Sequence, residues 1–458
     1  MKKNIDMLNG PIFSSVLRFA FPIIATGILQ ILYNNADIII VGQFSSAVNA
    51  VGAIGATTAI IHLIVNLFLG VSVGTNVALA QSVGRGDDAG SKKLVHSAVA
   101  LSLISGAIIT AIGLGLSSNL LTLMNTPQDI FAQSLLYLQI YFLGMPASMV
   151  YNFGSAILRA KGDTKRPLII LSTSGLINVL LNLFFVIGFD MGVDGVAWAT
   201  TISQYLAAAA IIVVLIKETG CFKLELKSFK LSAKESLLIL RYGIPAGLTS
   251  IMFSISNIFI QTALNSYDNA ALLDGSAASA GLEGIVYTSI NAFGQASLTF
   301  VGQNYGAQNY RRIPKIFAIC TAISVTLGLG IGSLMYLFGT PLLKLYLPTA
   351  TQQTIAYGLT RMMCIMLTQF IACIMEVQIG VIRGIGYSTI PSIVTILTIC
   401  VFRIVWIFTL YPIVGTLESL FICYPISWIL SVAVLQIVYR VVYKKELKKA
   451  QIYQELQE

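Results

Sequence analysis

A carboxylate inside an apolar helix is the group in this chain best suited to do chemistry. Asp37 lies within the apolar run 14–41, and Gln30, Tyr33 and Asn34 precede it at helical spacing. On an α-helix these four side chains form one polar stripe. Placing a charged side chain in the middle of a bilayer costs about 2.5–3.5 kcal/mol on the membrane-insertion scale, which gives the lowest values. Such a residue is therefore by default a functional candidate. The alternative is a structural residue that bonds to a neighbouring helix.

The helices that must position this stripe fill most of the chain. Of its 458 residues, 56% are hydrophobic and 10% are charged, and the mean hydropathy is +0.83. This composition indicates an all-α polytopic membrane protein. A spanning helix needs about 20 apolar residues. We predict twelve transmembrane helices, over residues 14–42, 52–82, 94–116, 131–158, 167–188, 192–216, 235–264, 276–304, 315–338, 353–382, 389–411 and 414–443.

Basic residues mark one side of the predicted membrane protein. All but three of the 28 Lys and Arg residues lie at the two ends of the chain, in the loops that follow even-numbered spans, or in the first or last two turns of the spans next to these regions. The exceptions are Lys344, Arg361 and Arg403. The positive-inside rule then places both termini in the cytoplasm. We expect a multi-pass protein of the cell membrane. The net charge of +9 therefore does not indicate a nucleic-acid partner.

The second half of the chain repeats the first at an offset of 222 to 224 residues. The matching residues are Arg18 and Pro22 with Arg241 and Pro245, Gln81 and Gly84 with Gln303 and Gly306, and Arg159, Gly162 and Pro167 with Arg383, Gly386 and Pro391. We predict two six-helix lobes, 1–216 and 235–445, a cytoplasmic linker 217–234 and a cytoplasmic tail 446–458. Each lobe has an even number of spans, so we expect two parallel lobes related by a pseudo-two-fold axis along the membrane normal.

The ordered set of these features resembles the MATE family, the multidrug and toxic compound extrusion transporters. The resemblance covers essentially the whole chain and rests on the twelve spans, the repeat, the Gly-Gln-Asn-Tyr-Gly-Ala stretch 302–307 and the paired Arg-x-x-Gly loops. It implies an antiporter that exports lipophilic, often cationic, drugs or metabolites by alternating access. It implies coupling to Na⁺ or H⁺ and no other cofactor. We expect a monomer whose partners are small molecules and membrane lipids.

The resemblance also implies a cation site in the N-terminal lobe, at Asp37, Asn178, Asn182 and Thr200. The spacing agrees, because Asn178 and Asn182 are four residues apart and share a helix face. Carboxylate, amide and hydroxyl oxygens suit Na⁺, and the same carboxylate can take a proton. Some relatives carry an aspartate in place of Asn182, so the coupling ion stays open. Pro22 matches a proline at which relatives bend, and we predict a hinge there; a simple kink is the alternative.

The second lobe lacks this polar set and carries other charges. At the repeat positions of Asp37, Asn178 and Asn182 stand, in order, Ile260, Phe402 and Trp406. Glu283, Arg361, Arg403 and Glu418 fall at like depth and suggest a buried, charge-balanced network, whose role the sequence leaves open as structural or functional. Glu376 lies deeper on its helix, without an obvious partner. We predict that Glu376 meets a cationic substrate or a second proton.

A substrate cavity between the lobes is expected to combine a few acids with adaptable apolar side chains. The resemblance places Gln30 and Tyr33 in that cavity, next to Asn34, and Asn152 is expected to face it. From the second lobe we predict contributions of Glu283, Tyr287, Asn291 and Glu376; the first three are spaced four residues apart.

Three other functions compete with this interpretation. A flippase for lipid-linked saccharides of the same superfamily would need a more basic cavity than Arg361 and Arg403 supply. An enzyme is not expected, because the HExxH and phosphate-loop motifs are absent. An ion channel fits poorly with a duplicated chain whose acid site lies in one lobe. The six cysteines show no CxxC spacing, so we expect neither zinc nor disulfides.

Overall fold

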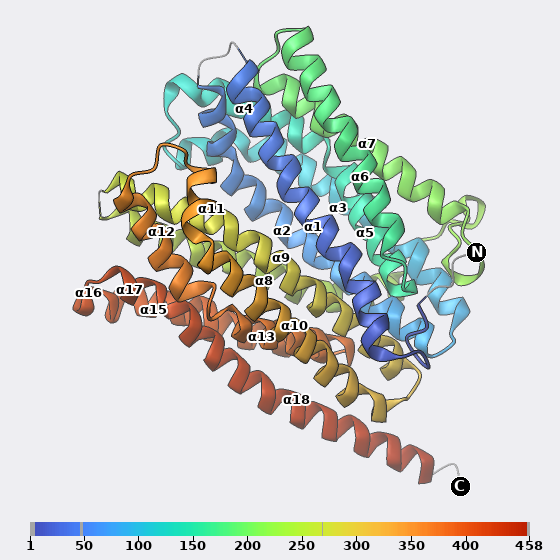
Figure 1. Cartoon of the computed structure of the whole chain (residues 1–458). Coiled ribbons are helices and arrows are strands. Elements are labelled where there is room, and N and C mark those ends of the chain that lie inside the picture. The colour runs from blue at the N-terminus through green and yellow to red at the C-terminus, as the bar shows by residue number, and fades with distance from the viewer. Residues whose placement is uncertain (1–4, 46–48, 268, 456–458) are drawn as a thin grey trace. The chain divides into compact units, whose positions relative to one another are not determined.

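The computed structural model describes residues 5–45, 49–267 and 269–455. Within these ranges the chain consists of helices and connecting turns, with no strand (Figure 1). The first half contains α1 (Ile12–Phe44), α2 (Ala50–Gly84), α3 (Asp88–Leu123), α4 (Gln128–Leu143), α5 (Met145–Lys161), α6 (Lys165–Leu183), the π-helical segment η1 (Phe184–Gly188) and α7 (Val193–Ile216).

Two short 3₁₀ segments, η2 (Gly220–Phe222) and η3 (Leu226–Ser228), lead into the second half. That half contains α8 (Ala233–Asn265), α9 (Ala270–Gly306), the 3₁₀ segment η4 (Tyr310–Arg312), α10 (Ile313–Leu337), α11 (Gly339–Tyr346), α12 (Gln352–Ile365), α13 (Gln369–Gly384), α14 (Thr389–Thr395), the π-helical segment η5 (Ile396–Val401), α15 (Phe402–Thr409), α16 (Tyr411–Val414), α17 (Leu417–Phe421) and α18 (Cys423–Glu455).

Each predicted span coincides with a helix or with consecutive helical segments. Among the described residues, nine helices or continuous runs are long and apolar enough to cross a membrane, and two bent pairs pass the same test. The pairs are α4–α5, bent by 46°, and α12–α13, bent by 44°. The eighth predicted span is α9, which has 37 residues, enough length to cross a bilayer. The predicted all-α, twelve-helix membrane fold is therefore confirmed.

The sequence explains why two of the spans are bent. Pro146 is near the first residue of α5, directly after the break at Gly144, and a proline cannot continue the hydrogen-bond ladder of the preceding helix. Between α12 and α13, the Thr368 hydroxyl donates to the Cys364 carbonyl over 2.6 Å. Such back-bonding competes with the helix ladder and bends helices.

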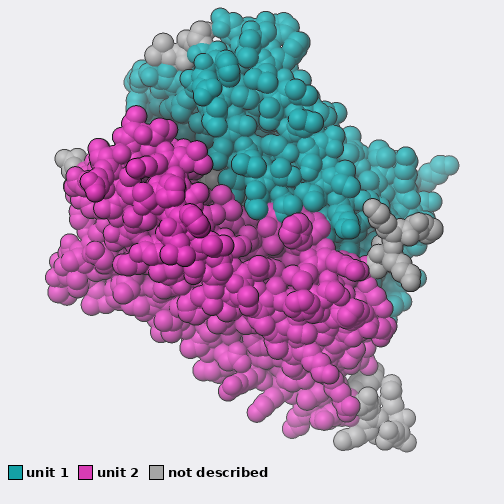
Figure 2. Space-filling model, viewed as in Figure 1, with its two compact units in different colours: residues 1–4, 25–247 teal, residues 5–24, 248–458 magenta. Residues whose placement is uncertain are grey.

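The chain forms two compact units, which Figure 2 shows in teal and magenta. Unit 1 contains Ala25–Gly247 and unit 2 contains Ile5–Ile24 and Leu248–Glu458. Both α1 and α8 contribute residues to both units. In each helix the division falls two residues after an internal proline, Pro22 in α1 and Pro245 in α8. The linker predicted at 217–234 is part of unit 1, with Phe222 and Leu224 buried in its apolar core.

In unit 1, α2 and the first part of α8 approach each other through four glycines. These are Gly70 and Gly74 on α2, and Gly243 and Gly247 on α8. A Cβ atom built on any of the four would collide with backbone atoms of the other helix. Small residues spaced four apart allow this close backbone approach between membrane helices. We call this contact the glycine seam.

Unit 2 has its own apolar core around α9 and the first part of α1. The Phe19 and Phe300 rings meet edge to face with centroids 5.7 Å apart, and both are fully buried. The Asn304 side chain donates to the Met7 carbonyl over 2.9 Å. These contacts attach residues 5–24 to α9 although almost 300 residues separate them in the chain.

Candidate functional site

Three helices of unit 1 bring the predicted cation-site residues together around Asp37. The Asn182 amide donates to Asp37 Oδ1 over 2.5 Å, and the Thr200 hydroxyl donates to Asp37 Oδ2 over 3.3 Å. Asn178 donates to Thr200 over 3.2 Å and accepts a longer bond from Asn182, 3.4 Å. Asp37 is 7% exposed and Asn182 is fully buried. The four predicted side chains therefore form one connected, water-poor polar cluster.

The cluster retains an unused acceptor. The side-chain oxygen Oδ1 of Asn182 is buried and has no hydrogen-bond partner. A buried polar atom without a partner is costly, and a bound cation would satisfy this oxygen. Together with Asp37, Asn178 and Thr200, it offers the hard oxygen donors that Na⁺ prefers. The donor set fits a small cation, and the single carboxylate fits a proton equally well.

The position of Asp37 follows from how α1 packs on α6. The Tyr33 hydroxyl donates to the Ser172 carbonyl over 3.2 Å, and a Cβ on Gly175 would collide with the Tyr33 ring. The glycine thus lets α1 lie close to α6, one helical turn before Asp37. Directly after Asn182, α6 passes into the π-helical segment η1, a feature common at functional sites.

Two aromatic residues near Asp37 were missed at the level of sequence. Tyr137 and Tyr141 of α4 lie within electrostatic range of the Asp37 carboxylate, and their rings stack with centroids 6.0 Å apart. Tyr137 is buried in the same apolar cluster as Ile40 and Val41. Their spacing of four residues puts both on one helix face, as it does Asn178 and Asn182, but it does not distinguish them from packing residues.

The other residues predicted for the first lobe do not join this cluster. Gln30 and Asn34 are exposed on α1, and Tyr33 packs on α6 as described above. Asn152 donates to the Ser148 carbonyl of its own helix over 2.8 Å. Pro22 lies inside α1 and belongs to unit 2.

The four-charge network predicted for the second lobe is only partly present. Arg361 pairs with Glu283 over 3.0 Å and donates to the Ser276 hydroxyl over the same distance. Glu418 is exposed. Among the described residues, no carboxylate lies within 4.0 Å of Arg403, which packs on the Tyr424 ring instead. The prediction of one balanced network is therefore wrong, because depth along a helix does not determine which face a side chain occupies.

Glu376 has the partner that the sequence did not reveal. The Tyr287 hydroxyl donates to its Oε1 over 3.4 Å, and Asn291 lies in hydrogen-bond range of Tyr287. Tyr287 is 43% exposed. Glu376, Tyr287 and Asn291 thus form a second polar group in unit 2, separate from the ion pair of Glu283 and Arg361.

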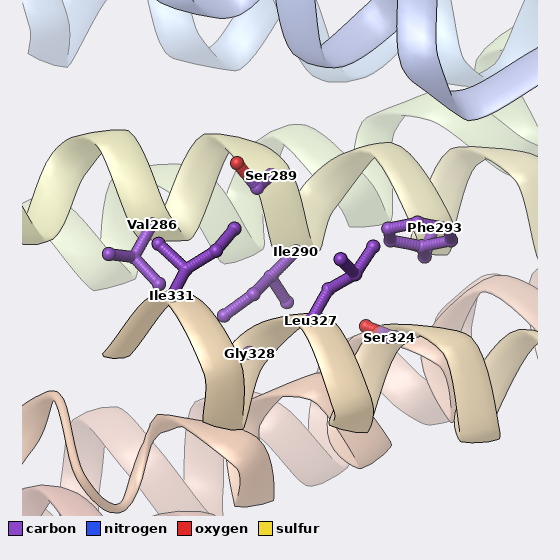
Figure 3. A pocket seen from close by; sticks show the side chains of 8 residues that line it. All are labelled: Val286, Ser289, Ile290, Phe293, Ser324, Leu327, Gly328 and Ile331. Atoms are coloured by element: carbon purple, nitrogen blue, oxygen red, sulfur yellow. The ribbon is translucent and has the colours of Figure 1, made fainter. Parts of the chain in front are cut away.

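A small apolar pocket lies between α9 and α10 of unit 2 (Figure 3). Its empty volume is about 170 Å³, and its lining consists of Val286, Ser289, Ile290, Phe293, Ser324, Leu327, Gly328 and Ile331. This volume includes space open to solvent, and the gap between the side chains does not enclose a water-sized sphere. None of the predicted substrate residues lines this pocket, so it is not the predicted substrate site.

Comparisons with known proteins agree with the repeated architecture. The family model MatE matches residues 22–184 and again residues 245–409. The Bacillus subtilis protein named "Probable multidrug resistance protein YpnP" is 28% identical over 360 residues, which cover 78% of this chain and 79% of that protein. "Probable multidrug resistance protein NorM" of Thermotoga maritima is 27% identical over 401 residues, 85% and 83% of the two chains.

A solved structure of similar fold is that of a MOP superfamily transporter from Pyrococcus furiosus. It aligns with a TM-score of 0.90 at 21% identity, over 97% of this chain and 99% of that one. Its described binding pocket of reversed polarity belongs to that protein, and the likeness concerns the fold alone. Because the family model matches both halves and most of the sequence, this chain belongs to the MATE family of multidrug efflux transporters.

Proposed function

We propose that this chain is an antiporter that exports lipophilic, often cationic, small molecules and is driven by Na⁺ or H⁺ entering at Asp37. The observation that carries the proposal is the buried cluster of Asp37, Asn178, Asn182 and Thr200, with its unused oxygen on Asn182. A carboxylate in a membrane helix is expensive. Two hydrogen-bonding neighbours from two other helices, Asn182 and Thr200, support the proposal of a binding site rather than a stray charge.

The cluster offers two ways to bind a coupling ion. A sodium ion would take oxygens from Asp37, Asn178, Asn182 and Thr200, while a proton would neutralise Asp37 alone. Either event removes the net negative charge of the cluster. The interaction free energy between α1 and its neighbours α6 and α7 then changes, because α1 supplies the charge and the other two helices supply its hydrogen-bond partners. Binding of the ion is thereby able to shift a conformational equilibrium.

The first helix offers a way to transmit this change. Pro22 and Asp37 are 15 residues apart on α1, about 22 Å at 1.5 Å per residue. Since α1 supplies residues to both units and changes unit just after Pro22, a bend there would couple ion binding to alternating access. Pro22 is accordingly our candidate hinge.

Unit 2 supplies the residues proposed for substrate binding. Glu376 with Tyr287 and Asn291 offers a carboxylate and amphipathic surface to a lipophilic cation. Glu283 pairs with Arg361, which favours a structural role for it over contact with the substrate. Gln30, Asn34 and Asn152 remain candidate lining residues of unit 1. We further propose a monomer in the cell membrane with both termini in the cytoplasm, as the distribution of Lys and Arg predicts.

Transport by reconstituted vesicles tests the proposal. Efflux of a fluorescent lipophilic cation would be measured under an imposed Na⁺ or H⁺ gradient, for wild type, Asp37→Asn and Asp129→Asn. Asp129 is an exposed carboxylate that accepts a bond from Asn49, and it serves as the matched control. We expect one gradient to drive efflux in wild type and Asp129→Asn and to fail in Asp37→Asn. Undiminished transport by Asp37→Asn would refute the proposed coupling site. Inactivity of wild type under both gradients would favour a lipid-linked saccharide flippase.

A further inference from the structure

A buried arginine in unit 2 is held by aromatic rings instead of by a carboxylate. Arg403 of α15 is 2% exposed. Its guanidinium carbon lies 3.9 Å from the Tyr424 ring centroid and 6.0 Å from that of Trp428. Its Nε donates to the Ser427 hydroxyl over 3.1 Å. In the described part of the chain no acid lies within ion-pair distance of it. We call Tyr424, Ser427 and Trp428 the aromatic box.

The aromatic box corresponds, in the sequence repeat, to the helix that carries Thr200. The segment Ala-Thr-Thr-Ile-Ser at residues 199–203 matches Cys-Tyr-Pro-Ile-Ser at residues 423–427, at an offset of 224. Tyr424 is therefore the repeat partner of Thr200, and Ser427 is the partner of Ser203. Where unit 1 offers a hydroxyl to Asp37, unit 2 offers the face of an aromatic ring.

Arg403 itself takes the place that Asn178 has in unit 1. The buried pair near the end of α6 is Asn178 and Asn182, and the buried pair on α15 is Arg403 and Ile407. These pairs differ by 225 residues, one more than the sequence offset. The π-helical segment η5 directly precedes α15, and a π-bulge takes up one extra residue within a helix. This change of register turns Arg403, rather than Phe402, toward the neighbouring helix.

We propose that Arg403 is a resident cation of unit 2, which occupies the place that the exchangeable coupling ion takes in unit 1. The proposal rests on the proposed cation site at Asp37. A planar guanidinium stacks well on aromatic faces, and this attraction strengthens where water is excluded. At the repeat position of Asp37 stands Ile260, which is buried and apolar. Because the box contains no carboxylate, it suits a guanidinium or another organic cation and not Na⁺.

The consequence is a functional difference between the two halves of a duplicated chain. A cation that is covalently attached to α15 cannot leave during a transport cycle. The aromatic box therefore stays occupied, while the Asp37 cluster can fill and empty. In this way exchange of the ion is confined to unit 1, and the packing of α15 on α18 does not vary with the ion gradient.

Chemical rescue of Arg403→Ala tests the resident cation. Thermal unfolding of the purified, full-length protein would be followed with and without millimolar methylguanidinium, with NaCl of equal concentration as a comparison. We expect Arg403→Ala to unfold several degrees below wild type, and methylguanidinium to restore most of that loss. NaCl should restore none, and wild type should not respond to methylguanidinium. An unchanged unfolding temperature in the variant, or a loss that methylguanidinium does not repair, would overturn the proposal.

A second pair of variants keeps the test decisive if Arg403→Ala does not fold. Tyr424→Phe keeps the ring under the guanidinium, whereas Tyr424→Leu removes it, and both lose the hydroxyl that contacts Arg361. We expect Tyr424→Leu to be several degrees less stable than Tyr424→Phe. Equal stability of the two would contradict the role of the ring. These measurements use no ion gradient, so failure of coupling at Asp37 would appear only in the vesicle assay and would be distinguishable.

Discussion

Asn182 and Asp37 are 145 residues apart in the chain, and the side chain of the first donates a 2.5 Å hydrogen bond to the carboxylate of the second. Both side chains are at least nine-tenths buried. The bond fixes one carboxylate oxygen and leaves the amide oxygen of Asn182 without a partner. Asn182 thus orients Asp37 through its amide NH₂ group and offers its side-chain oxygen as a ligand to a cation.

Substitution of Asn182 should therefore weaken ion binding more than substitution of an amide elsewhere. Asn182→Ala removes the donor to Asp37 and the unused oxygen, so we expect the ion concentration that half-saturates transport to rise about 10- to 100-fold, as for lost partners of other metal ligands. Asn152→Ala removes an amide that bonds only within α5 and should leave this concentration unchanged. Initial efflux rates across a series of gradients would measure both. Equal responses of the two variants would count against the site.

The resemblance to the MATE family predicted these four residues, and helical spacing agreed with it because it reports which side chains share a face. Asp37 stands out by its charge, and Asn178 and Asn182 by their spacing of four residues. The same reasoning predicted the twelve spans, since spans are local features of composition. Tyr137 and Tyr141 were missed because two tyrosines in an apolar helix do not differ from ordinary packing residues.

The packing of unit 2 was harder to predict, for two physical reasons. Glu283 and Arg361 pair across helices α9 and α12, but depth alone also suggested Glu418 and Arg403 as partners, which they are not. The π-helical segment η5 then shifts the buried face by one residue, so the repeat offset of the sequence assigns Phe402 where the structure places Arg403. Neither effect is encoded in residue spacing.

The glycine seam should tolerate no side chain. At Gly74 a Cβ would meet the backbone of α8, whereas at Gly55, on the same helix α2, there is nothing within 4 Å. We expect Gly74→Ala to lower the free energy of unfolding by about 1–3 kcal/mol through overpacking. Gly55→Ala should raise it by roughly 0.5–1 kcal/mol, because alanine is the better helix former. Thermal unfolding in detergent would measure both, and the prediction fails if the two changes have the same sign.

Glu376 should act on the substrate and not on the ion. Because Tyr287 is its hydrogen-bond partner and is partly exposed, Glu376→Gln should raise KM for a lipophilic cation about 10-fold, roughly one lost charged contact. KM for a neutral lipophilic substrate should change little. Glu283→Gln is the contrasting variant: it leaves Arg361 buried without its acid, so the expected loss is of stability, about 3–5 kcal/mol. If Glu376→Gln affects both substrates equally, its role is structural.

Glu218 provides a pH-dependent contribution to stability just beyond the end of α7. Its carboxylate pairs with Lys161 over 2.5 Å and also with Arg166. Burial raises the pKa of Glu218, but the hydrogen bonds and charges of Lys161 and Arg166 outweigh burial and hold the pKa below its ordinary value. A depressed carboxyl pKa contributes stability that is complete above the unfolded-state pKa, about 4.3, and is lost as the pH falls through the folded-state pKa.

Glu218→Gln should therefore cost about 1.5–3 kcal/mol at pH 7, the range for hydrogen bonds to charged groups, and the difference from wild type should shrink below about pH 4. The control is Glu225→Gln, because Glu225 pairs with Lys92 over 2.7 Å while more than a third of each side chain is exposed. Such surface pairs are worth roughly 0–1 kcal/mol. Thermal unfolding between pH 7 and about pH 3.5 would compare the three proteins. A Glu218→Gln deficit that stays constant over this range would show that the carboxylate acts by shape and not by charge.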